Sequence, residues 1–213
     1  MIVRYADAVD RLARLPAVLP PPPDELMPIR LDGLGWRGVP DEGAARPAAV
    51  LVLIVPGDED EALVVLTERA HRGGHHSGEV SFPGGQAEPD DADVVATALR
   101  EAAEEVRLDP VAAGVRIVGV LDRFWIPVSS FKVTPVLAIA DRRPVLVPAP
   151  DEVARIVEAP LRHFVPGAPI RIVDRTIRSI PLRYGTYPVD GLTIWGATAR
   201  VLGQLGAIIV PGA

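Results

Sequence analysis

Residues 74–108 read GHHSGEVSFPGGQAEPDDADVVATALREAAEEVRL, and the last third of this stretch predicts a helix with an acidic stripe. Apolar residues recur at helical spacing across residues 93–106. Glu101 lies three residues before Glu104 and four before Glu105, so a helix presents the three carboxylates in roughly the same direction. Because like charges repel one another, this arrangement favours a cation between them.

The predicted cation site lies beside a glycine-rich turn. Carboxylate oxygens are the ligands that hard ions such as Mg2+ and Mn2+ prefer. Gly84 and Gly85 stand just upstream of the helix. Glycines serve a tight turn, and they also let backbone amides approach a phosphate. The stretch therefore predicts a Mg2+ or Mn2+ site that is built for phosphate chemistry.

The composition excludes several classes of protein. The chain has 213 residues, enough for one large domain, and its 48% of hydrophobic residues can bury a substantial core. A net charge of −6 and a pI near 5.2 argue against nucleic acid as the main partner, because that binding needs a basic surface. The chain has no cysteine, which excludes disulfides, thiolate zinc sites and a cysteine nucleophile.

No segment of the sequence predicts membrane association. The longest apolar run, residues 48–56, is too short to span a bilayer as a helix. Residues 1–15 have Asp and Arg among their apolar residues and lack the hydrophobic block of a secretory signal. We therefore expect a cytoplasmic protein without a membrane partner. The oligomeric state stays open, with a homodimer as one possibility.

Strands and helices alternate along the chain, which predicts an α/β protein with a mixed sheet between helices. The predicted helices are residues 2–15, 93–106 (with Asp93 as the N-cap) and 193–205. The predicted strands are residues 48–55, 62–67, 115–120, 132–140 and 152–158, and a loop with Phe124 to Pro127 joins the third to the fourth. Because residues 20–23 are all proline, we expect residues 1–45 to be a helix and extension that pack on a main domain, residues 46–213.

Together, the turn and the helix resemble the Nudix box. That motif has a glycine, an acidic residue, and then Arg-Glu-hydrophobe-any-Glu-Glu-any-Gly-hydrophobe, and here Gly85 precedes REAAEEVRL at residues 100–108. Residues 66–70 (LTERA) and 76–85 (HSGEVSFPGG) are similar to the extra signature of the coenzyme A pyrophosphatase branch. The resemblance to that branch extends to residues 97–102, 131–136, 151–153 and 194–199, so it covers about residues 48–205.

Two positions depart from the general box. The interval from Gly85 to Arg100 is one residue longer, as it is in the coenzyme A branch, and the first acidic residue of the box falls near Asp91 or Asp93. Arg107 stands where the family usually has glycine. A non-glycine residue in a left-handed helix end costs about 1 kcal/mol. We expect this to affect stability and to leave the carboxylates untouched.

The resemblance implies a Nudix-type α/β/α sandwich and a set of site residues. The implied catalytic residues are Glu101, Glu104, Glu105, Arg100 and Glu152, and the metal ligands are Glu101, Glu105 and Glu104. The implied substrate-binding residues are Arg69, His76, Gly78, Gly84 and Gly85. Arg100 would orient the carboxylates as well as form an i,i+4 pair with Glu104. Either Glu104 or Glu152 would be the general base.

Four other residues have open roles. In the family an acidic or amide residue at the position of Glu79 lies on the strand into the turn, near the metals. Phe124 and Trp125 either line an adenine or pantetheine pocket or pack in the core. We expect Trp195 to serve packing.

The implied partner is a small-molecule diphosphate. A metal-dependent pyrophosphohydrolase would split coenzyme A, or an acyl-coenzyme A, into 3′,5′-ADP and 4′-phosphopantetheine or its acyl form. Alternative substrates are a nucleoside triphosphate, ADP-ribose and NADH. A non-catalytic nucleotide-binding Nudix module is less favoured, because such proteins usually lose box glutamates and all three are present here. A structural protein with an acidic helix is the plainest alternative.

Overall fold

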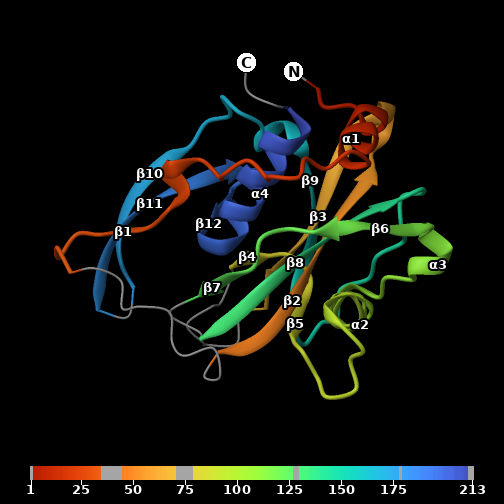
Figure 1. The fold of residues 1–213 in the computed structure, drawn as a ribbon, viewed down its shortest axis with the longest axis horizontal. Helices are drawn as coiled ribbons and strands as arrows, with labels where there is room; N and C mark the ends of the chain where they lie inside the picture. Colours follow the sequence, from red (N-terminus) through yellow and green to blue (C-terminus); the bar gives the residue numbers. More distant parts are fainter. Residues whose placement is uncertain (1, 35–44, 71–78, 127–129, 178, 211–213) are drawn as a thin grey trace.

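The computed structural model describes residues 2–34, 45–70, 79–126, 130–177 and 179–210. A large mixed sheet forms its centre, with the strand order β4-β3-β2-β8-β6 (Figure 1). The central pair, β2 and β8, is parallel, and the other pairs in this sheet are antiparallel. Its strands are β2 (Arg46–Pro56), β3 (Ala62–Arg69), β4 (Val80–Ser81), β5 (Gly84–Gln86), β6 (Val115–Val120), β7 (Phe124–Ile126), β8 (Phe131–Ala140) and β9 (Val153–Pro160).

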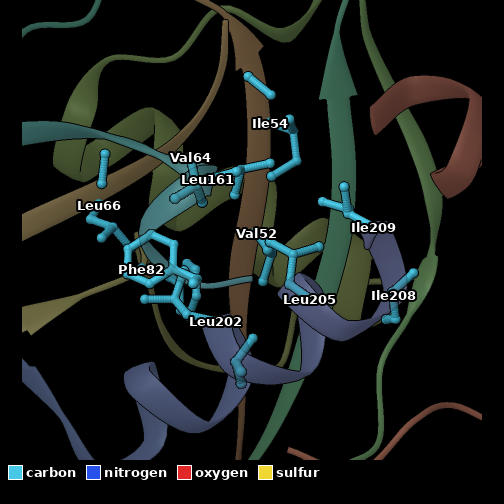
Figure 2. Close-up of a cluster of buried hydrophobic side chains, with 14 of the residues drawn as sticks. Val52, Ile54, Val64, Leu66, Phe82, Leu161, Leu202, Leu205, Ile208 and Ile209 are labelled. Carbon is cyan, nitrogen blue, oxygen red and sulfur yellow. The ribbon is translucent and has the colours of Figure 1, made fainter. Parts of the chain in front are cut away.

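Helices cover both faces of this sheet, because its central strands are apolar on both faces. On β2, alternate side chains belong to two separate core clusters, with Leu51 and Leu53 in one and Val52 and Ile54 in the other. The first cluster packs under α2 (Val94–Val106). The second packs under α1 (Tyr5–Leu12) and α4 (Gly196–Ile209), and Figure 2 shows its side chains from β2, β3 and α4. The predicted α/β/α sandwich with a mixed sheet is therefore confirmed.

A second, smaller sheet was not predicted from the sequence. It has the order β1-β11-β10, with β12 also paired to β11. Its strands are β1 (Ile29–Arg30), β10 (Arg171–Ile177), β11 (Ile180–Val189) and β12 (Leu192–Trp195). In β10 most side chains are exposed, so the strand lacks the apolar pattern by which buried strands are recognised in a sequence. The remaining elements are α3 (Pro110–Ala113) and the 3-10 turns Asp24–Leu26, Asp58–Asp60 and Leu161–His163.

Three predicted elements need correction. Residues 124–126 form strand β7 against β8, although we predicted a loop there. The predicted helix at residues 193–205 begins only at Gly196, because residues before it pair with β11 as β12. The first helix spans Tyr5–Leu12 instead of residues 2–15, since Arg4 already forms a bridge to Glu61. In each case strand pairing with a distant segment overrides the local pattern.

The described part of the segment before β2 is attached to the rest of the fold at several places. Helix α1 packs against α4, and β1 pairs with β11. The predicted division into residues 1–45 and 46–213 stays a prediction. In the part of the chain that the structure describes, no helix is long and apolar enough to cross a membrane.

Candidate functional site

The glycine corner lies so close to its neighbours that neither glycine tolerates a side chain. Gly84 has φ +155°, and a Cβ there would lie 2.4 Å from the carbonyl oxygen of Ala49. A Cβ on Gly85 would lie 2.5 Å from the carboxylate of Glu101. Strand β5 starts at this corner and pairs with β2. The corner is therefore fixed against both the central sheet and the acidic helix.

Helix α2 begins and ends as its sequence predicts. The Asp93 carboxylate accepts hydrogen bonds from the amides of Val95 (2.9 Å) and Ala96 (2.8 Å), which makes it the N-cap. Arg107 ends the helix in the left-handed conformation, with φ 52° and ψ 37°. The conformation expected at this position is confirmed, and it is one that glycine adopts more easily.

Arg100 is the centre of a network of ion pairs. Its Nε and Nη2 bind both oxygens of Asp91, at 3.0 and 3.1 Å, and Nη2 also donates to the carbonyl of Gln86. Its Nη1 binds Glu101 (3.0 Å) and Glu104 (3.1 Å). The i,i+4 pair with Glu104 is thus present, together with a contact to Glu101. The paired guanidinium holds the pKa of the Asp91 carboxyl well below its usual range.

Asp91 is a positioning residue that the sequence left without a role. Its two-pronged contact fixes the guanidinium plane of Arg100, which in turn holds Glu101. The signal in the sequence was the acidic residue required between the box glycine and the helix, for which Asp91 and Asp93 were both candidates. The structure separates them, since Asp91 binds Arg100 and Asp93 caps the helix.

Glu105 is a buried carboxylate, with 7% of its surface exposed. Its Oε2 accepts a hydrogen bond of 3.1 Å from the Gly84 amide. Burial raises the pKa of Glu105 to about 7, the charges of Glu101 and Glu152 add to the rise, and the Gly84 amide and Arg69 oppose it. Burial also raises the pKa of Glu101. Arg100 lowers it, and the charges of Glu104 and Glu152 add to the rise.

Glu152 and Arg69 come to the same place from distant parts of the sequence. Glu152 directly precedes β9, and its carbonyl accepts the amide of Ala70, at the end of β3. Strand β3 ends with Arg69, whose positive charge lies close enough to Glu105 to lower the pKa of that carboxyl. Two further predicted residues, His76 and Gly78, lie outside the described residues. The other predicted site residues therefore surround one corner between α2, β3 and β5.

The side chains at this corner would have to move to bind a metal ion. Within the described ranges, no three His, Asp or Glu side chains are arranged to hold a metal as they stand. Glu101 and Glu104 both point to Nη1 of Arg100. The donor set nevertheless fits a hard divalent cation, because it consists of carboxylate oxygens. Burial raises the pKa values of Glu101 and Glu105, and the neighbouring carboxylates add to the rise.

The aromatic residues occupy three different environments. The Phe124 ring lies under the guanidinium of Arg200, 5.0 Å from its centroid. The Trp125 Nε1 is buried and, among the described residues, has no hydrogen-bond partner. Trp195 stacks on Tyr184. None of these contacts assigns Phe124 or Trp125 to a ligand pocket, so that question stays open.

Comparison with known proteins gives the family. The family model described as NUDIX domain matches residues 45–162. Nudix hydrolase 15, mitochondrial, of Arabidopsis thaliana is 37% identical over 169 residues, which are 76% of this chain and 58% of that protein. The uncharacterized Nudix hydrolase NudL of Salmonella paratyphi B is 36% identical over 163 residues, which are 75% of this chain and 81% of that protein.

A solved structure, that of the Nudix hydrolase RenU from M. smegmatis, aligns with a TM-score of 0.46 at 22% identity, covering 63% of this chain and 79% of that one. This chain spans a little over half the length of the plant relative. The family match covers more than half of the chain and includes the glycine corner, the acidic helix and Glu152. The chain belongs to the Nudix hydrolase family.

Proposed function

We propose that this chain is a divalent-metal-dependent pyrophosphohydrolase that cleaves the diphosphate of coenzyme A or an acyl-coenzyme A. The products would be 3′,5′-ADP and 4′-phosphopantetheine or its acyl form. The observation that carries the proposal is the convergence of Glu101, Glu105 and Glu152 on the glycine corner, where burial holds the pKa of Glu105 near 7. The substrate class comes from the resemblance of residues 66–70 and 76–85 to the coenzyme A branch.

Mg2+ or Mn2+ would be held by Glu101 and Glu105, with Glu104 beside them. When bound, such an ion offsets the charge of the diphosphate and acidifies a bound water. Arg100, fixed by Asp91, keeps Glu101 oriented toward the corner. Glu152 or Glu104 would accept the proton of the attacking water.

Arg69 and the glycine corner would position the phosphates. Arg69 supplies a positive charge near Glu105. The Gly84 amide donates to Glu105 and thereby holds that carboxylate beside the turn. Gly85 leaves the space that Glu101 occupies. His76 and Gly78 complete the proposed substrate-binding set through the family resemblance alone.

Product analysis tests the proposal directly. Coenzyme A is incubated with the protein and Mg2+ or Mn2+, and the products are identified by mass spectrometry. We expect 3′,5′-ADP and 4′-phosphopantetheine, and Glu105→Gln should lower turnover at least a hundredfold. Glu158→Gln is the control, because Glu158 pairs with Arg143 away from the corner. Near wild-type turnover in Glu105→Gln would show that the metal site is wrong.

Competition among substrates separates the alternatives. Nucleoside triphosphate, ADP-ribose and NADH are each offered against coenzyme A, and kcat/KM is compared. A higher kcat/KM for one of these compounds than for coenzyme A would assign the chain a different substrate for the same type of reaction. Binding of coenzyme A with Mn2+ but without turnover would favour a nucleotide-binding module. The cytoplasmic location and the homodimer stay predictions, for fractionation and light scattering to test.

A further inference from the structure

Trp195 and Tyr184 form a stacked pair where the smaller sheet meets the start of α4. Their ring centroids lie 5.1 Å apart with 31° between the planes. Tyr184 is buried, whereas Trp195 is only partly buried. Neither ring belongs to the two core clusters that hold the sandwich together. Tyr184 therefore supports an indole that keeps exposed surface, an arrangement that the packing of the core does not require.

This pair adjoins the strand that leads into the glycine corner. Strand β12, which ends with Trp195, contacts β4. On α4, the Thr198 hydroxyl donates a hydrogen bond of 3.0 Å to the carbonyl of Val80. Gly84 is four positions after Val80, at most about 13 Å of extended chain. The aromatic pair and the acidic corner thus lie at the two ends of one short segment, a span that a nucleoside diphosphate can cover.

One of the two charges near the pair, that of Arg175, suits a ligand that carries phosphate. Burial raises the pKa of Tyr184, Arg175 opposes the rise and Glu79 adds to it, so both charges lie near the phenol. Arg175 is exposed on β10 and forms no ion pair with any described residue. A guanidinium of this kind binds phosphate oxygens readily. The aromatic surface has a cation beside it, as a phosphorylated nucleoside requires.

We propose that the Trp195–Tyr184 pair stacks on the purine base of the substrate, which makes Trp195 a specificity-determining residue for adenine-containing diphosphates. The inference rests on the proposed function, since it names how that site recognises its substrate. It assigns a binding role to the smaller sheet, which lies outside the residues 45–162 that the family model matches. Every base has a π-face for such stacking, and the ring of Trp195 offers the matching surface.

Binding without turnover tests the stacking. The metal-free protein is titrated with 3′,5′-ADP by calorimetry. Trp195→Leu should weaken binding about tenfold, because base–aromatic stacking is worth that order of affinity. Trp195→Phe should bind within about twofold of the wild type, since it keeps a ring. Tyr5→Phe is the control, because the Tyr5 hydroxyl binds the carbonyl of Ala140 away from the corner, and this variant should bind normally. Equal affinity of Trp195→Leu and the wild type would overturn the proposal.

Fluorescence covers the case in which Trp195→Leu does not fold. Adding 3′,5′-ADP should quench tryptophan emission in the wild type and in Tyr5→Phe, but not in Trp195→Phe. Persisting quenching in Trp195→Phe would place the base elsewhere and overturn the proposal.

Steady-state kinetics separates this inference from the proposed function. In Trp195→Leu the KM for coenzyme A should rise about tenfold while kcat stays within about twofold. Coenzyme A hydrolysis with an unchanged KM would leave the function standing and remove the stacking. Binding of 3′,5′-ADP that depends on Trp195, without any hydrolysis, would remove the function and leave the stacking.

Discussion

The backbone amide of Gly84 donates a 3.1 Å hydrogen bond to Oε2 of Glu105, which lies 21 residues further along the chain. This bond joins the glycine corner to the last turn of α2. The bond supplies one hydrogen-bond donor to the buried carboxylate, which favours its charged form. Burial and the neighbouring carboxylates outweigh this donor, so the pKa of Glu105 rises to about 7. The corner and the helix are thus a single electrostatic unit.

The raised pKa of Glu105 predicts how stability depends on pH without metal. A folded-state pKa of about 7 lies above the ordinary value of 4.5. The folded state therefore holds the proton more tightly, and the Glu105 contribution to stability is complete below about pH 4.5 and is lost as pH rises through 7. Glu105→Gln should remove this slope. The measurement is Tm against pH for both proteins in EDTA, and parallel curves from pH 4.5 to 7 would contradict the assignment.

Substitution of the two glycines should give two different kinds of damage. In Gly85→Ala the new methyl group meets the Glu101 carboxylate, so we expect kcat to fall about a hundredfold while most of the stability is kept. In Gly84→Ala the methyl group meets backbone of Ala49 at a φ that alanine rarely adopts, so folding itself should suffer. Thermal melts and kcat for the two variants check this. Equal loss of stability in both would refute it.

Arg107 should be replaceable with a gain in stability. It is exposed and ends α2 with φ 52°, a left-handed conformation that glycine adopts at lower energy. Arg107→Gly should stabilise the protein by about 0.5–1 kcal/mol, with a rise in Tm of about 1–4 °C and unchanged kcat. Arg107→Ala is the matched control, because it removes the side chain and keeps the strain. A similar gain in Arg107→Ala would show that the side chain, not the backbone, is responsible.

The elements that the sequence predicted best are those with a strong local pattern. Helix α2 has an N-cap at Asp93 and a full apolar face, so its limits followed from residues 93–106 alone. Strands β2 and β8 are buried on both faces, and their apolar runs were visible for that reason. The smaller sheet has no such run. Most of β12 was predicted as the start of a helix, because only its pairing with β11 makes it a strand.

The candidate site was predictable to a similar extent. The spacing of Glu101, Glu104 and Glu105 placed them on one helix, which the structure has. It did not reveal that Glu105 is buried while Glu104 is largely exposed, because burial depends on the glycine corner that packs over one side of the helix. Nor did it give Asp91 its contact with Arg100, since the loop between them must fold back first.

The general base can be identified by comparing Glu152→Gln with Glu104→Gln. Glu152 adds to the raised pKa of both Glu101 and Glu105, whereas Glu104 adds only to that of Glu101. Glu104 is also engaged by Arg100 at 3.1 Å, and its side chain is largely exposed. A base must reach the water at the corner, so we expect Glu152→Gln to lower kcat about a hundredfold or more and Glu104→Gln about tenfold.

The measurement is kcat with saturating Mg2+ for both variants and the wild type. Loss of the base should make the fall in kcat at least about ten times larger in Glu152→Gln than in Glu104→Gln. The reverse order of the two effects would make Glu104 the base, in which case the Arg100 contact must break during turnover. Asp151→Asn is a neighbouring control that should keep kcat near the wild-type value.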